Sequence, residues 1–277
     1  MLDVRRACRM YEGREIYANP PLEYVATEVR YPYAPRLRQP EVLDGVLIAL
    51  AHRFPRPAPA MALGGYNVGL APQVETVTRA FNKAHTWAVT VMPTAITIET
   101  TMYAEFDGLR LVVEECLDAL VRHAKIAAVE RVGLRYVNEF RIPSPVESLH
   151  AYRGWIADRL IDHMDLAGGL TPSATQGVVQ YEAPGAQGMI ARFGASLTGV
   201  GVIGDEPLRR RKGLVEGPYF ALDIDSFWHP PVEDAPDFDT SVILGMLDEL
   251  HRPIGSTFQN AITEQLREGV LRRTVSA

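Results

Sequence analysis

Two aspartates and three arginines with strand spacing are the residues best placed to do chemistry. Asp223 and Asp225 are separated by one residue in a segment with strand composition, so both carboxylates face the same side of the strand. Two such carboxylates can share a divalent cation. The alternative is cross-strand pairing with arginines, which Arg131, Arg135 and Arg141 can supply. The strand position favours ion pairs, so we expect no metal, and Asp223 and Asp225 are the candidates if one binds.

A second concentration of positive charge is the run Arg209-Arg210-Arg211-Lys212. Such a run can hold a phosphate or an acidic partner, or it can be a solvated loop. We expect the ligand- or partner-binding residues to be the three arginines of this run together with two strand arginines and one asparagine. The set is Arg131, Arg135, Asn138, Arg209, Arg210 and Arg211.

Three glycines, Gly199, Gly201 and Gly204, match the dinucleotide-binding pattern GxGxxG. That pattern binds pyrophosphate only where it opens a helix, and here a charged loop follows, so we interpret it as a flexible turn. The chain also lacks GxSxG, HExxH, the P-loop motif and CxxC. We therefore expect no cofactor and assign no catalytic residue. Whether the protein is an enzyme stays open, with a non-catalytic role favoured.

Composition excludes several classes of protein. Of the 277 residues, 47% are hydrophobic and 22% charged, as in an ordinary globular protein. The net charge of -6 argues against a duplex-DNA surface, and no apolar run is long enough to span a membrane. The first residues do not resemble a signal peptide, and the two cysteines, Cys8 and Cys116, do not suggest a disulfide scaffold. We expect a soluble, cytoplasmic protein.

Hydrophobic periodicity predicts the elements that must position these residues. In the first half we expect a strand at 24–33, a helix from 40 to the prolines at 55–59, strands at 74–82, 86–92 and 95–103, and a helix at 106–124. In the second we expect a strand at 129–142, a helix at 147–165, strands at 175–183, 188–198 and 218–228, and a helix at 240–264.

Both halves therefore have the order β-α-β-β-β-α, which predicts an α+β fold with mainly antiparallel sheets and helices on one face. The repetition suggests an internal duplication, although such an order also arises by chance. The predicted division is a leader at 1–16, a first half at 17–128 and a second half at 129–277.

The strand at 129–142 has the clearest period of two. Leu134 and Tyr136 face one side, with Asn138 among them, whereas Arg131 and Arg135 face the other.

Three groups of residues carry a resemblance to a known family. They are Asn19-Pro20-Pro21-Leu22-Glu23 with Val29-Arg30-Tyr31, the strand Arg131-Val132-Gly133-Leu134-Arg135-Tyr136-Val137-Asn138, and Leu222-Asp223-Ile224-Asp225 with Phe227, Leu247, His251 and Phe258. Together they resemble a bacterial family of sporadically distributed proteins of unknown function, over about residues 17–265. The resemblance implies genes that travel in islands for conflict or specialised metabolism. It implies no catalytic residue.

The function that we expect is a binding or accessory module that acts with a partner protein or a small ligand, and a homodimer stays open. Clefts between paired halves are favoured ligand sites. The alternative is an enzyme in the same cleft, with Asp223 and Asp225 as the ligands if it depends on a metal.

Overall fold

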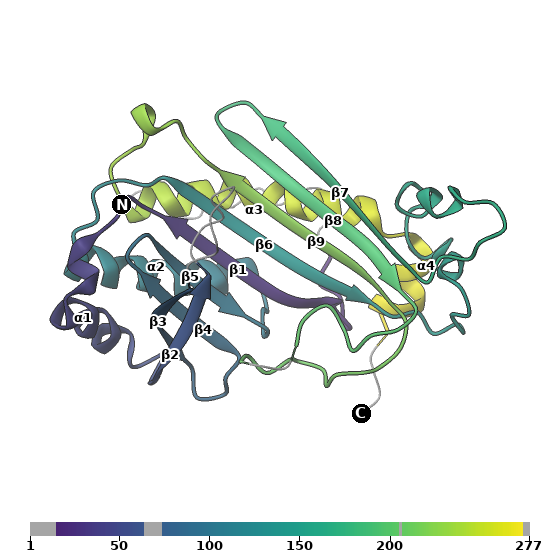
Figure 1. Ribbon diagram of the computed structural model, residues 1–277, viewed down its shortest axis with the longest axis horizontal. Coiled ribbons are helices and arrows are strands. Elements are labelled where there is room, and N and C mark those ends of the chain that lie inside the picture. The colour runs from purple at the N-terminus through teal and green to yellow at the C-terminus, as the bar shows by residue number, and fades with distance from the viewer. Residues whose placement is uncertain (1–14, 64–73, 205–206, 274–277) are drawn as a thin grey trace, which may run out of the picture.

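One nine-stranded antiparallel sheet organises the protein (Figure 1). The structure is a computed structural model that describes residues 15–63, 74–204 and 207–273. The strands are β1 (Leu22–Arg30), β2 (Arg56–Leu63), β3 (Val74–Phe81), β4 (Trp87–Met92), β5 (Ala95–Thr100), β6 (Arg131–Phe140), β7 (Ala174–Ala183), β8 (Gln187–Ser196) and β9 (Tyr219–Trp228). They lie side by side in the order β2-β3-β4-β5-β1-β6-β9-β8-β7.

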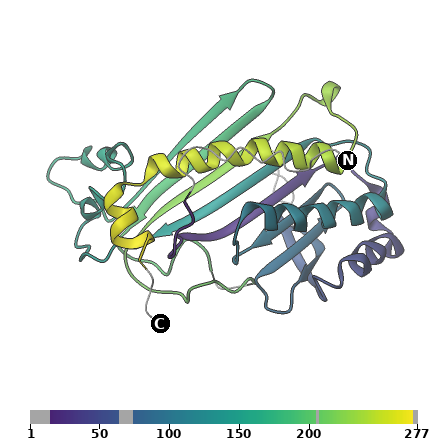
Figure 2. The same cartoon turned by 180° about the vertical axis from the view of Figure 1, so that it is seen from behind.

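The helices gather on one face of this sheet, as Figure 2 shows. They are α1 (Pro40–Leu50), α2 (Phe106–Ala124), α3 (Thr240–Ala261) and the single turn α4 (Glu264–Leu266). We call this side of the sheet the helix face and the other side the open face. The α+β class, the antiparallel sheet and the placement of helices on one face agree with the sequence analysis. In the part of the chain that the structure describes, no helix is long and apolar enough to cross a membrane.

Local sequence explains where α3 begins. The Asp239 side chain accepts hydrogen bonds from the backbone amides of Ser241 at 2.7 Å and Val242 at 3.2 Å. These amides lack partners within the helix, so the aspartate satisfies donors that the first turn leaves open. The N-cap is thus Asp239, and the hydroxyl of the next residue, Thr240, donates to Asp118 on α2.

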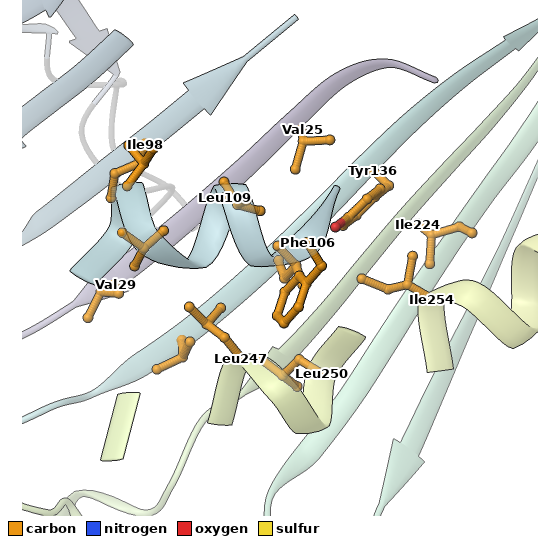
Figure 3. Close-up of a cluster of buried hydrophobic side chains, with 14 of the residues drawn as sticks. Val25, Val29, Ile98, Phe106, Leu109, Tyr136, Ile224, Leu247, Leu250 and Ile254 are labelled. Carbon is orange, nitrogen blue, oxygen red and sulfur yellow. The ribbon is translucent and has the colours of Figure 1, made fainter. Parts of the chain in front are cut away.

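The core lies between the helix face and α2 and α3. Figure 3 shows side chains from both halves converging there. The labelled members are Val25 and Val29 of β1, Ile98 of β5, Phe106 and Leu109 of α2, Tyr136 of β6, Ile224 of β9, and Leu247, Leu250 and Ile254 of α3. Cys116 is fully buried in the same core, as its place on the apolar side of a helix predicts.

Strand β6 confirms the predicted register. Leu134 is fully buried and Tyr136 nearly so, on the helix face, whereas the side chain of Arg135 is 47% exposed on the open face. The strand pairs with β1 on one side and β9 on the other. The alternation of its side chains therefore determines which residues lie on each face at the centre of the sheet.

Two elements differ from the prediction. Residues 147–165 do not form a helix but three 3₁₀ turns, Leu149–Tyr152, Asp158–Leu160 and Asp162–Asp165. Gly154 interrupts the segment with a φ of 80°, outside helical backbone. Strand β2 was not expected, because Pro57 and Pro59 indicated a break; an edge strand tolerates both prolines.

The strand orders of the halves can now be compared. From the centre outward the first half runs β1-β5-β4-β3-β2 and the second runs β6-β9-β8-β7. In each half the first strand is central and the last strand lies beside it. The order β-α-β-β-β-α is not fully met, because the first half has the additional strand β2 and the second lacks the helix after its first strand. Most of the predicted leader, residues 1–14, falls outside the described residues.

A shared sheet and core predict that the halves unfold together. Leu117→Ala in α2 and Leu247→Ala in α3 each remove a buried side chain, so each should cost about 2–5 kcal/mol and move one common transition. Urea unfolding followed by the fluorescence of Trp87 alone and of Trp228 alone, in variants that keep only that tryptophan, measures this. Separate midpoints for the two probes would show independent halves.

Candidate functional site

A ladder of ion pairs crosses the centre of the open face. Arg135 donates to both carboxylate oxygens of Asp223, each at 2.8 Å. Arg131 lies 3.0 Å from Glu28 and 3.4 Å from Asp225. Strands β1, β6 and β9 are adjacent, so each pair spans neighbouring strands. The aspartates thus make the cross-strand arginine contacts that their spacing favoured.

Asp223 has a further partner in Arg192 of β8, at 3.4 Å. Burial raises the pKa of Asp225, and the nearby arginines only partly counter this effect. Within the described residues no three His, Cys, Asp or Glu side chains cluster in a way that could hold a metal ion. The contacts that the two aspartates make are with the guanidinium groups of Arg131, Arg135 and Arg192. A hollow of about 530 Å³ lies beside them, with Arg135 and Arg192 in its wall.

The basic run lies in a segment, residues 207–213, that we call the strap. The strap follows β8 and connects to the first half. The backbone amide of Arg209 donates to the carbonyl of His85 at 2.7 Å, and Thr101 donates to the Arg209 carbonyl at 2.5 Å. Lys212 donates to the Asn19 side chain at 2.6 Å. Only Arg209 and Lys212 are exposed, so a fully solvated loop is a wrong description of the run.

Arg210 lies under the strap in a buried ion cluster. Its guanidinium is 3.2 Å from Glu23 and 3.1 Å from Glu139, and its side chain is only 2% exposed. Burial opposes ionisation of Glu139, but the Val202 amide, Arg141 and Arg210 together lower the pKa of this carboxyl. Burial instead dominates at Glu23 and raises its pKa. The cluster joins β1, β6 and the strap, which is a structural role.

The glycine motif packs against this cluster. Gly201 has a φ of 129°, and a Cβ there would lie 2.3 Å from an Arg210 nitrogen and 2.6 Å from Glu139. The motif therefore lies in a bending loop, as the sequence interpretation of a turn predicts, and Gly201 packs over a buried ion pair. It opens no helix, so the arrangement that holds pyrophosphate is missing at this motif.

A second pocket lies on the helix side, where the two halves meet. We call it the junction pocket. It has a volume of about 450 Å³ and takes its walls from residues 15–22, from 103–104 before α2, from β6, from the strap and from the last turns of α3. Its lining includes Tyr103, Tyr136, Asn138, Arg211 and His251.

The polar groups of the junction pocket are ordered by contacts around them. The Tyr136 hydroxyl donates to that of Tyr103 at 3.0 Å. His251 stacks flat on Phe106 with ring centroids 4.0 Å apart and an interplanar angle of 2°. Asn138 donates to the Leu222 carbonyl at 3.2 Å. Figure 3 shows the Tyr136 hydroxyl directed toward the end of α2 where Phe106 begins the helix.

The expected binding residues separate into four places. Arg131 and Arg135 lie on the open face, Arg210 is buried, and Arg209 is at the surface. Asn138 and Arg211 line the junction pocket on the other face. Arg211 also donates to the Tyr103 carbonyl, which fixes the strap at the pocket wall.

Most of the pocket residues were not among the sequence candidates. Tyr103, Tyr136 and His251 come from different elements, and each reads in sequence as a core or helix-end residue. The available signal was weak: Tyr136 shares a face with Asn138, and His251 is among the residues that carry the family resemblance. Comparison with known proteins adds nothing here, since no family model matches the chain and no curated protein matches it.

The buried cluster predicts a large cost for removing its cation. Arg210→Met leaves two buried carboxylates without their shared partner and should lower the free energy of unfolding by about 3–5 kcal/mol. The matched control is Arg209→Met at the exposed neighbour, which should change it by less than about 0.5 kcal/mol. Adding Glu23→Gln and Glu139→Gln to Arg210→Met should recover most of the loss. Chemical denaturation gives these values, and equal effects at 209 and 210 would contradict the buried cluster.

The raised pKa of Glu23 predicts a pH dependence. Its folded-state pKa exceeds the ordinary 4.5, so the folded state holds the proton more tightly. That contribution to stability is present at low pH and is lost as the pH rises from about 4.5 through the folded pKa. Glu23→Gln cannot titrate, so its stability relative to the wild type should increase across this window and then level off. Urea denaturation of both proteins from pH 4 to 8 measures this, and a constant difference would argue against it.

Proposed function

We propose that this protein is a binding module that takes a small ligand into the junction pocket. The observation that carries the proposal is the composition of the pocket wall: both halves contribute, and aromatic surface surrounds a few fixed polar groups. Small-molecule sites typically have this character, with volumes of about 300–1,000 Å³. A pocket of about 450 Å³ lies within that range.

The wall chemistry favours a flat, mostly apolar ligand that carries an anionic group. Tyr17, Tyr136 and Phe258 offer aromatic surface, and Arg211 offers guanidinium N–H groups. The acidic residue at the rim, Glu15, is paired with Arg272 at 2.7 Å, so its charge is balanced locally. An aromatic carboxylate or sulfonate satisfies both the apolar wall and the cation.

An enzyme in the same pocket is the alternative, and a specific observation supports it. The Tyr103 and Tyr136 hydroxyls are coupled at 3.0 Å, and the His251 ring centroid lies 6.0 Å from that of Tyr136. Such groups can transfer protons. An enzyme of this kind would not draw on Asp223 and Asp225, which lie on the opposite face of the sheet and pair with arginines. Turnover of a bound ligand that Tyr136→Phe abolishes would favour the enzyme.

The wider assignment is also a proposal. We propose that the chain belongs to the sporadically distributed bacterial family that it resembles, acts in the cytoplasm as an accessory protein of a gene island, and arose by internal duplication. Counted from the centre of the sheet outward, the first four strands of the two halves follow the same chain order, β1-β5-β4-β3 and β6-β9-β8-β7, and this supports the duplication. Superposition of β1-β5-β4-β3 on β6-β9-β8-β7, with the same direction for every strand, tests it.

The ligand proposal can be tested with two dyes that differ by one charge. The sulfonate 1-anilinonaphthalene-8-sulfonate and the uncharged N-phenyl-1-naphthylamine share one ring system, and both fluoresce in apolar sites. Arg211→Leu should weaken binding of the sulfonate about tenfold, or about 1.4 kcal/mol, and leave the neutral dye nearly unchanged. Equal effects on both dyes would contradict a role for Arg211 in charge recognition.

Blocking the pocket provides the complementary test. Ala104 is an exposed residue at the rim, so Ala104→Trp should obstruct the mouth without disturbing the core and abolish binding of both dyes. Ala51→Trp, at an exposed alanine after α1, is the matched control and should bind as the wild type does. Fluorescence titration measures both. Retained binding in Ala104→Trp would place the dyes elsewhere and remove the support for this pocket.

A further inference from the structure

The two edges of the sheet are built differently. Strand β2 at one edge contains Pro57 and Pro59, which have no N–H and so cannot donate to an added strand. Strand β7 at the other edge has the sequence ATQGVVQYEA, with no proline, no lysine and the single charge of Glu182. Edge strands without such devices readily pair with another chain. One edge is thus protected and the other is not.

Strand β7 also exposes apolar side chains on both faces. Val178 on the open face is 58% exposed, and Val179 and Tyr181 on the helix face are 39% and 47% exposed. Figure 1 shows β7 as the outermost strand on its side of the sheet. A ten-residue strand with this composition and exposure has the features of a pairing surface.

We propose that a second copy of this chain pairs with β7 in antiparallel fashion and joins two sheets into one. A two-fold axis normal to the sheet keeps each side chain on its own face, so the axis must pass midway between one residue and the same residue of the other copy. We place it at Val178, near the middle of the strand. The valine then faces its own copy, Gln176 faces Gln180, and Tyr181 faces Thr175.

This self-pairing is chemically compatible along the whole strand. Glu182 faces Ala174 of the other copy, so no like charges oppose one another. The valine pair on the open face loses water, and the unpaired N–H and C=O groups of both edges bond to each other. A peptide of another protein would need its own matching pattern, whereas β7 already matches itself.

The oligomeric state of the full chain tests the proposal. Sedimentation equilibrium should give twice the chain mass of 30.7 kDa. Val178→Lys places two lysines opposite each other and should raise the dimer dissociation constant at least tenfold. Val232→Lys, the same change at a valine 82% exposed elsewhere, is the control and should remain dimeric. A monomeric wild type, or a dimer unaffected by Val178→Lys, overturns the proposal.

Charge exchange tests the position of the axis. Val178→Lys and Val178→Glu should each be monomeric alone, and an equimolar mixture should recover a dimer, because opposite charges then meet. Val178 is exposed in the monomer, so circular dichroism should report unchanged folds for both variants. Amide hydrogen exchange adds a direct readout, since residues 174–183 should exchange more slowly in the wild type than in Val178→Lys. A mixture that stays monomeric overturns the axis at Val178, and equally fast exchange overturns pairing through β7.

Discussion

The antiparallel pairing of β1 with β6 is the interaction on which the rest of the structure depends. It runs from Leu22 opposite Asn138 to Arg30 opposite Arg131, and it is the only strand contact between the halves among the described residues. Because it makes one sheet out of two, α2 and α3 lie over the same face and close a common core. The same pairing places residues 15–22 beside Tyr136 and Asn138, so the junction pocket exists only when it is formed.

Periodicity predicted the parts of the fold whose local pattern and tertiary environment agree. Strand β6, α2 and α3 have apolar residues with the period of the element that forms. The segment 147–165 fails because Leu149, Tyr152, Trp155 and Ile156 are spaced as on a helix but serve irregular turns. Gly154 adopts a positive φ, and the Thr263 hydroxyl donates to its carbonyl at 2.5 Å, so a tertiary anchor overrides the local preference.

The site was less accessible to sequence reasoning than the fold. The pairing of Asp223 with Arg135 follows from strand alternation, since both residues lie on one face of adjacent strands. The burial of Arg210 cannot be predicted in this way, because nothing in the local sequence distinguishes it from Arg209. Arg210 is buried because it pairs with the distant residues Glu23 and Glu139. The junction pocket depends on segments far apart in the chain, so no local motif identifies it.

The central pairing also determines when the protein can fold. Glu28 and Arg131, which meet across β1 and β6, are separated by 103 residues, and Asn19 and Lys212 by 193. During synthesis β1 therefore waits, with one edge unpaired, until β6 has left the ribosome, and the strap can close only later. Contacts of such long range slow folding because the chain must lose loop entropy before it gains them. Building one sheet from two distant halves therefore has a kinetic consequence: folding is on the slow side of the usual range for single domains. Until β6 arrives, the inner edge of β1 is exposed to chaperones or to aggregation.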